Sequence, residues 1–194
     1  QLNTAYPATA YIKGFLESKN VKATQLDLSI ELFTAVFTKE FIDAIFKQAD
    51  LLGNKELPLV YKQKEEYIHK VESVMNYLRV QEVTAAYQIV HKDYLPHGHR
   101  RIKLDKDLTT EFGNLGILDK AKHIATLFVE ELGDFINANV DEFFSFTRYA
   151  EQLARAASSF DTIADYLQYE TTLIEDEMLY LLEEQLQKDT YDLV

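Results

Sequence analysis

Histidines and arginines gather in one short stretch of the chain, where their side chains could bind either a metal or an anion. His97 and His99 could ligate a metal together with the carboxylate of Asp93, because imidazole and carboxylate are common metal ligands. Arg100 and Arg101 could instead bind an anion or a phosphate-bearing ligand, because guanidinium groups donate paired hydrogen bonds to such groups. An exposed polar loop without a ligand is the interpretation that the composition favours most.

Carboxylates occur in two further patterns that could carry chemistry. Glu66 and His69 have the spacing that places both side chains on one helical face, as di-iron helical bundles require. Such a site needs a second pair of this kind, and the sequence contains none. Acidic runs at 175–177 and 183–184 could offer oxygen ligands for a hard cation or paired carboxylates for acid–base catalysis. Consecutive residues of a helix point in different directions, so both runs are better interpreted as a solvated surface.

The absence of cysteine limits the chemistry further. With no cysteine, the chain has no disulfide, thiol nucleophile, zinc–thiolate site or cysteine-ligated iron–sulfur cluster of its own. The sequence also contains no glycine-rich phosphate loop and no nucleophile-elbow motif. We therefore predict no catalytic residue and no metal site within these residues.

Charge is distributed unevenly along the chain. The formal net charge is −12, and residues 130–194 hold 16 acidic but only 3 basic side chains. Such a surface repels phosphate backbones and anionic lipid headgroups, so neither nucleic-acid nor membrane binding is expected. The acidic surface is either simply solvated or a docking site for a basic protein partner. Because there is no signal peptide and no long apolar run, the expected location is the cytoplasm.

The beginning of the chain predicts a helix followed by a strand. Pro7 suits the first turn of a helix, where its missing N–H is harmless, and apolar residues then recur at helical spacing through residue 19. Asn20 can adopt the left-handed conformation that ends a helix. Residues 21–27 alternate apolar with polar side chains, as a half-buried strand does.

From Leu28 onward the apolar spacing is helical. We expect a helix from Leu28, a second one that Thr38 caps and Gly53 ends, and one long helix or two in series over 62–91. The stretch 93–116 contains one proline and three glycines, which indicates a loop with one short helix. Further helices are expected after four capping residues, namely Asp119, Asp141, Asp161 and Thr172.

Both ends of the chain resemble a known family. The run from Asn3 to Leu16, followed by the alternating segment 21–27, resembles the N-terminal region of radical S-adenosylmethionine proteins that carry a cobalamin-binding-type domain. In that family a first strand ends in a proline-containing loop, a helix with a tyrosine-proline and glycine-phenylalanine-leucine run follows, and a second strand ends in aspartate. The last residues, Tyr191 to Val194, resemble the opening of the family's next strand. The helical stretch between these segments has no counterpart in the resemblance.

The resemblance implies an iron–sulfur oxidoreductase that cleaves S-adenosylmethionine to start radical chemistry. Its 4Fe-4S cluster is held by a Cys-x-x-x-Cys-x-x-Cys motif in a later barrel domain, and that motif is absent here. This chain would thus be the non-catalytic accessory or substrate-recognition part, with the remainder of the parent polypeptide as its partner. The cobalamin signature Asp-x-His-x-x-Gly is also missing, because Asp93 and Gly98 stand at a different spacing, which argues against bound cobalamin.

The resemblance also suggests a ligand site at the start of the chain. It places the loop at the carboxyl edge of the first strand, where doubly wound sheets bind ligands. The candidate ligand-binding residues are therefore the loop residues together with the basic segment described above, namely Asn3, Thr4, Tyr6, Pro7, His97, His99, Arg100 and Arg101.

The expected fold class is mainly α, with a helical block inserted in a partial α/β, doubly wound, cobalamin-binding-like unit that has few short strands. The expected divisions are 1–37 for the partial βα unit, 38–189 for the helical insertion and 190–194 for the start of a further strand. Two isolated strands form no stable sheet, so these would pair with strands elsewhere in the parent or with another molecule. The missing initiator methionine and the finish at Val194 suggest a trimmed segment.

Two alternative functions remain open at this point. One is a helical protein-interaction module that docks a basic partner on its acidic face. The other is a helical metal-binding protein that uses Glu66, His69 and further carboxylates.

Overall fold

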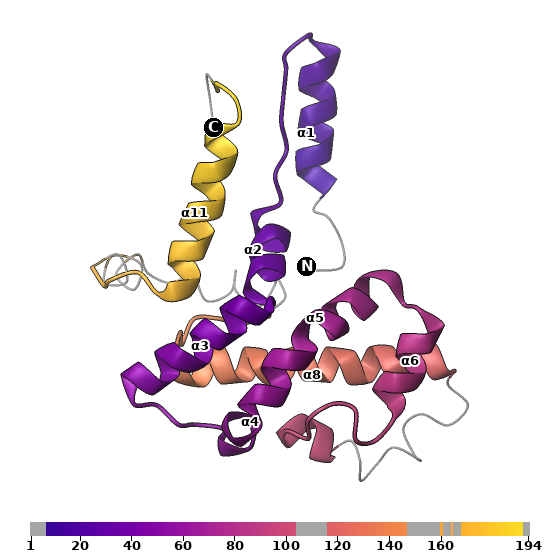
Figure 1. Ribbon diagram of the computed structural model, residues 1–194. Helices are drawn as coiled ribbons and strands as arrows, with labels where there is room; N and C mark the ends of the chain where they lie inside the picture. The colour runs from indigo at the N-terminus through magenta and orange to yellow at the C-terminus, as the bar shows by residue number, and fades with distance from the viewer. Residues whose placement is uncertain (1–6, 104–115, 147–159, 161–163, 165–167, 192–194) are drawn as a thin grey trace. The chain divides into compact units, whose positions relative to one another are not determined.

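The chain divides into two compact units. A computed structural model describes residues 7–103, 116–146, 160, 164 and 168–191. Unit 1 combines Gln1–Ala35 with Thr147–Val194, and unit 2 is Val36–Phe146. The described residues are mainly helical and include no strand (Figure 1), so the expected mainly α class is confirmed. The expected insertion, 38–189, covers most of unit 2 and also residues that the structure groups with the start of the chain.

Unit 1 contains three described helices. Helix α1 is Pro7–Ser18, α2 is Leu28–Val36 with its last residue in unit 2, and α11 is Leu173–Gln187. Proline occupies the first position of α1, and Asn20 lies in the left-handed region with φ of 59°, as the sequence predicts. Thr172 caps α11 in a reciprocal capping box with Glu175, which satisfies two of the N–H groups at the helix start.

The strand predicted at 21–27 is wrong for the described structure. These residues run as an extended coil beside α1 (Figure 1), and no strand among the described residues pairs with them. An isolated strand has no ladder of backbone hydrogen bonds, so alternation alone cannot make it part of a sheet. Residues 190 and 191 are also not in a strand, and the rest of the strand expected at the end of the chain lies outside the described residues.

Unit 2 is built around one long helix. Helix α8, Ile117–Asn139, contacts α3, Lys39–Leu52; α4, Pro58–Lys62; α5, Lys64–Val80; and α6, Val83–Val90. Figure 1 shows α8 passing behind α3 and α5, with α6 near one end. No helix in the described part of the chain is both long and apolar enough to cross a membrane.

Helix boundaries follow local signals in most places and depart from them in two, at the start of α8 and at Asp141. The stretch predicted as one or two helices over 62–91 is two, because Gln81 adopts a left-handed conformation with φ of 53°. Gly116, rather than Asp119, precedes the first residue of α8, and Asp119 lies in its first turn, where a negative charge suits the helix dipole. Asp141 accepts from the N–H of Phe143 in a turn, so the helix expected there does not form at 144–146. Its later part, and most of the helix expected after Asp161, lie outside the described residues.

The core of unit 2 forms where the helices meet α8. Phe135 on α8 is fully buried, and its ring centroid lies 4.6 Å from that of Phe46 on α3. Phe37 and Phe146, near the two ends of unit 2, have ring centroids 5.8 Å apart, so the chain enters and leaves this unit at neighbouring points. A Cβ on Gly133 would overlap the Phe146 ring, so glycine is needed for this close approach.

One buried asparagine at the end of α8 forms hydrogen bonds to the loop before α4. Asn139 is 1% exposed; its side-chain oxygen accepts from the N–H of Glu56 at 2.8 Å, and its amide donates to the Glu56 carbonyl at 3.3 Å. The Asn54 amide donates in turn to the Asn139 carbonyl at 3.0 Å. These bonds hold the loop that leads into the left-handed Leu57 at the start of α4.

Replacing Asn139 by alanine should lower the free energy of unfolding by about 1 to 3 kcal/mol, because Glu56 loses both hydrogen bonds to the Asn139 side chain and a small cavity remains at the end of α8. Asn76→Ala is the matched control, since Asn76 is exposed on α5 and its loss should change the free energy by less than about 0.5 kcal/mol. Urea denaturation of both variants measures the difference. Equal effects in the two variants would contradict the role assigned to Asn139.

Unit 1, by contrast, has little core among its described residues. Ile174 is its one buried apolar side chain there. On α1, Tyr11 is 80% and Phe15 is 63% exposed, and on α11 Tyr180 is 54% exposed. Helices gain most of their stability by burying an apolar face, so the described part of unit 1 leaves its own stabilising surfaces uncovered.

Candidate functional site

The basic segment, residues 97–101, is held against the rest of unit 2 by hydrogen bonds. Gln63, between α4 and α5, accepts from the His97 N–H at 3.0 Å and donates to the His97 carbonyl at 3.1 Å. The His97 ring Nε2 lies 2.7 Å from the Lys92 carbonyl oxygen. Residues 99–103 then form a short helical turn. Of the other predicted ligand-binding residues, Pro7 begins α1, and Asn3, Thr4 and Tyr6 lie outside the described residues.

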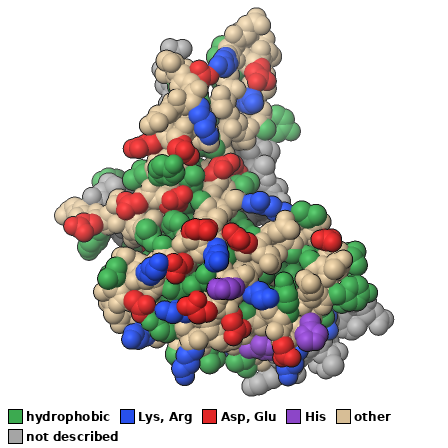
Figure 2. Space-filling view, viewed as in Figure 1, with side chains coloured by type: hydrophobic (Ala, Val, Ile, Leu, Met, Phe, Trp, Pro, Cys, Tyr) green, Lys and Arg blue, Asp and Glu red, His purple; other side chains and the backbone are tan. Residues whose placement is uncertain are grey.

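The guanidinium of Arg100 is held by carboxylates of α8. Its Nε and Nη2 donate to the two oxygens of Asp134 at 2.7 and 3.0 Å, and its Nη1 donates to Glu130 at 2.7 Å. The hydrogen bond to Asp134 and the nearby carboxylate charges raise the pKa of Arg100 despite partial burial, so the group stays charged. An external anion would have to displace two carboxylates to reach it. On the face that Figure 2 shows, basic and acidic side chains are interspersed over unit 2.

A buried carboxylate lies directly behind this arginine. Glu131 on α8 is 3% exposed, and its Oε1 accepts from the backbone N–H groups of Arg100 at 2.5 Å and Arg101 at 3.2 Å. Its Oε2 accepts from the Tyr67 hydroxyl at 2.7 Å. The carboxylate thus caps the turn at 99–103 and supplies the negative charge that the start of a helix favours.

Gly98 makes this arrangement possible. A Cβ at Gly98 would overlap the Glu131 carboxylate, so a larger residue there would force this carboxylate away from its hydrogen-bond donors. Tyr67 on α5 is fully buried, and its ring centroid lies 5.0 Å from that of Phe128 on α8. We call Tyr67, Gly98 and Glu131, with the N–H groups of Arg100 and Arg101, the Glu131 cluster. It joins α5, α8 and the basic segment.

The phenol of Tyr67 is held neutral by its surroundings. Burial raises its pKa far above that of a free tyrosine, and the charge of Glu131 and the hydrogen bond to it raise the pKa further. The unfolded chain releases this proton near pH 10, roughly the pKa of a free tyrosine. Stability from the neutral phenol is therefore complete below that pH and falls as the pH rises above it.

Removing the phenol should make the unfolding free energy less sensitive to alkali. Between about pH 9 and about pH 11.5, the unfolding free energy of the wild-type chain should fall with rising pH more steeply than the unfolding free energy of Tyr67→Phe. The difference in slope should reach about 1.4 kcal/mol per pH unit. At neutral pH the variant should lose about 1 to 2 kcal/mol, because Glu131 loses one donor. Urea titrations at several pH values measure both effects, and parallel curves would argue against a neutral buried phenol.

The other predicted residues that the structure describes differ in their exposure. Arg101 is only 4% exposed, and the Nδ1 of His99 is buried with no hydrogen-bond partner in the described part of the chain. Glu66 and His69 are exposed on α5. No group of three or more potential metal-ligating side chains occurs within the ranges that the structure describes. The anion and metal interpretations of this segment stay predictions.

Sequence reasoning missed the Glu131 cluster, although a signal for it was present. Glu131 stands in the apolar stripe of α8, between Phe128 and Phe135 at helical spacing. A carboxylate at such a position must be paired when the helix is buried on that face. Its partners come from residues 30 to 64 positions away, and no local pattern identifies them.

Comparison of the chain with family models, with characterised proteins and with solved structures gave no match. A functional assignment therefore depends on the residues and contacts themselves.

Proposed function

We propose that this chain is the non-catalytic N-terminal part, with an accessory or substrate-recognition role, of a radical S-adenosylmethionine iron–sulfur oxidoreductase. The chemistry belongs to the remainder of the parent polypeptide, because this chain has no cysteine to ligate a cluster. The resemblance of the run from Asn3 to Leu16 and of the last four residues to that family is the basis of the proposal.

The small number of buried apolar side chains among the described residues of unit 1 is the observation that carries the proposal. Both segments that resemble the family fall in unit 1, and its described residues bury one apolar side chain while Tyr11 and Phe15 stay largely exposed. A unit of this kind gains stability when further parts of a polypeptide cover it. This supports a chain that completes its fold with the remainder of a larger protein.

Unit 2 supports the same proposal through its place in the chain. It lies between the two sequence segments of unit 1, has its own core, and has Phe37 and Phe146 in contact at its ends. Self-contained units with adjacent ends are readily inserted into a host domain. Such an insertion suits an accessory or substrate-recognition role, because it adds surface without interrupting the host fold.

The proposal is tested on the natural polypeptide from which these residues come. We expect its remaining sequence to contain Cys-x-x-x-Cys-x-x-Cys, and the protein purified without oxygen to hold iron and sulfide and to consume S-adenosylmethionine under reducing conditions. Replacing the three cysteines by alanine should abolish both properties. A natural polypeptide without the motif, or one that binds no iron, would rule the proposal out.

A second variant tests the accessory role. Replacing 36–146 by a short glycine–serine linker should leave cluster content and basal S-adenosylmethionine consumption unchanged, because the ends of unit 2 are adjacent. Turnover of the parent enzyme's own substrate should fall. If the cluster is lost instead, unit 2 supports the host fold and has no separate accessory role.

One observation favours the alternative of an acidic docking module. Helix α11 carries acidic side chains at 175–177 and 183–184, and Leu179 and Tyr180 between these runs are exposed. Exposed apolar residues flanked by carboxylates fit a basic amphipathic partner. Binding to such a partner that weakens at high salt and is lost in a Glu183→Lys, Glu184→Lys variant would support this function, and salt-independent binding would argue against it.

A further inference from the structure

The chain after α8 folds back along that helix in residues 140–146, which we call the strap. Two backbone N–H groups at its start donate to the Ile136 carbonyl, at 2.9 and 3.0 Å, and reverse the direction of the chain. The Asn137 amide then donates to the carbonyls of Glu142 at 2.7 Å and Phe144 at 2.9 Å. These bonds hold the strap against the side of α8.

Phe146, the last residue of unit 2, places its ring on a glycine of α8. A Cβ on Gly133 would overlap this ring, so the ring lies directly on the helix backbone. Gly133 and Asn137 are four positions apart and therefore share one face of α8. The centroid of the Phe146 ring also lies 5.8 Å from that of Phe37 and 5.5 Å from that of Phe144. One aromatic side chain thus joins the exit of unit 2 to its entry.

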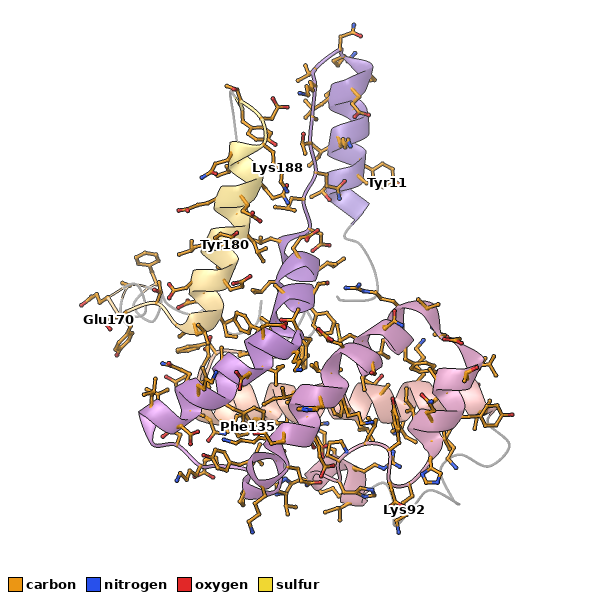
Figure 3. All side chains as sticks on the ribbon, viewed as in Figure 1. Tyr11, Lys92, Phe135, Glu170, Tyr180 and Lys188 are labelled. Atoms are coloured by element: carbon orange, nitrogen blue, oxygen red, sulfur yellow. The ribbon has the colours of Figure 1, made fainter. Side chains whose placement is uncertain are left out.

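The strap is held less firmly than the core beside it. Asn137 is exposed, so water competes for both of its hydrogen bonds, and Phe143 in the strap is 57% exposed. Phe135 on the same helix is fully buried among core side chains (Figure 3). Segments with few buried contacts open locally at a lower free energy than unfolding of the whole unit requires. The strap therefore opens more readily than the packed helices around it.

We infer that the strap opens and closes on α8, and that its state controls how freely unit 2 moves relative to the segments on either side. When the strap is closed, Phe146 holds the exit of unit 2 beside Phe37 at its entry. When it is open, the strap becomes a flexible linker that lengthens the tether of unit 2. The consequence for the parent enzyme rests on the proposed function, in which unit 2 is an inserted accessory unit.

Paired spin labels follow the strap in the 194-residue chain, which has no cysteine of its own to compete for labelling. Lys122→Cys on α8 and Ser145→Cys on the strap are both at exposed positions. Pulsed electron paramagnetic resonance should give one main, narrow distance in the otherwise wild-type chain. Gly133→Ala displaces the Phe146 ring and should raise the open, broad component at least about fivefold. An unchanged distance distribution would overturn the inference.

Asn137→Ala and Asn76→Ala form a matched pair for the same measurement. Asn137→Ala removes two hydrogen bonds to the strap without adding a clash, so the open component should rise at least about threefold. Asn76 is exposed on α5, and its substitution should change nothing. In a Phe146→Ala background, Gly133→Ala should have no further effect, because no ring remains to be displaced. Opening that occurs only when circular dichroism shows loss of the helices would overturn the inference.

A second pair of labels tests the movement of unit 2. Gln187→Cys on α11 lies in unit 1 and Lys122→Cys lies in unit 2, and both positions are exposed. The distribution of distances between them should be at least about twofold wider in Gly133→Ala than in the wild-type background, because the open strap lengthens the tether. Equal widths with the strap open would overturn its control of unit 2.

The full-length natural polypeptide shows whether the strap matters for the parent enzyme. Asn137→Ala should lower turnover of the parent's own substrate at least about twofold and leave cluster content and basal S-adenosylmethionine consumption unchanged. An opening strap in a polypeptide without the cysteine motif would support the strap and refute the radical S-adenosylmethionine assignment. A strap that stays closed in every variant, in a polypeptide that holds the cluster, would do the reverse.

Discussion

Replacing Glu131 by alanine should lower the free energy of unfolding of unit 2 by about 3 to 5 kcal/mol. The substitution removes the acceptor for the Tyr67 hydroxyl and for the N–H groups of Arg100 and Arg101. All three donors lie in a buried or partly buried place, where an unsatisfied donor costs about 1 to 3 kcal/mol. Chemical denaturation followed by circular dichroism measures the loss, and hydrogen exchange should show the segment near 98–103 opening first.

The neighbouring carboxylate provides the control. Glu130 also contacts Arg100, but 36% of its side chain is exposed, so Glu130→Ala should cost less than about 1 kcal/mol. Equal losses in the two variants would show that Glu131 acts only as a surface charge.

A double-mutant cycle of Gly98→Ala and Glu131→Ala measures the coupling between the Gly98 backbone and the Glu131 carboxylate. Gly98→Ala alone should destabilise unit 2 because the new Cβ overlaps the Glu131 carboxylate. In the Glu131→Ala background that carboxylate is gone, so the same substitution should cost much less. The loss in the double variant should therefore fall short of the sum of the single losses, and additive losses would contradict direct contact between the two residues.

Local signals predicted most of the helices, because each signal is a contact between neighbours in sequence. The Thr38 hydroxyl accepts from the Phe41 N–H and caps α3, and Gly53 ends that helix in the left-handed conformation with φ of 74°. Thr172 and Asn20 mark the other ends that were predicted correctly. These features need no information about the tertiary structure.

The strand prediction for 21–27 failed because strand pairing is non-local. Alternation shows which face of an extended segment could be buried, but it cannot supply the neighbouring strand. The helix predicted after Asp141 is absent at 144–146 for a related reason. An aspartate that accepts a hydrogen bond from the N–H two residues later starts a turn as readily as a helix.

The candidate site shows the same limit at the level of side chains. Arg100 attracted a ligand-binding interpretation because of its type and its basic neighbours, yet Asp134, which pairs with it, lies 34 residues further along the chain. Residue type suggested an anionic ligand for this arginine. Only the packing of the basic segment on α8 shows that the carboxylate belongs to the protein itself.

Residues 36–146 expressed alone should fold cooperatively, and their free energy of unfolding should lie within about 1 kcal/mol of the value for unit 2 in the whole chain. Nearly all the buried apolar side chains of the described structure belong to this unit, and the aromatic contact between Phe37 and Phe146 closes its ends. Contacts that stabilise it are therefore kept in the excised unit. Thermal unfolding monitored by circular dichroism and by tyrosine fluorescence should give one coincident transition.

Truncation within unit 2 gives the matched control. Residues 36–115 lack α8, the helix that α3, α5 and α6 all contact, so this shorter chain should remain unfolded. Helices α3, α5 and α6 would then expose the apolar surface that α8 covers, as the faces of α1 and α11 are exposed in unit 1. If the excised residues 36–146 unfold without cooperativity while the whole chain unfolds cooperatively, unit 2 depends on residues outside it. That result would contradict the view that unit 2 is a self-contained insertion.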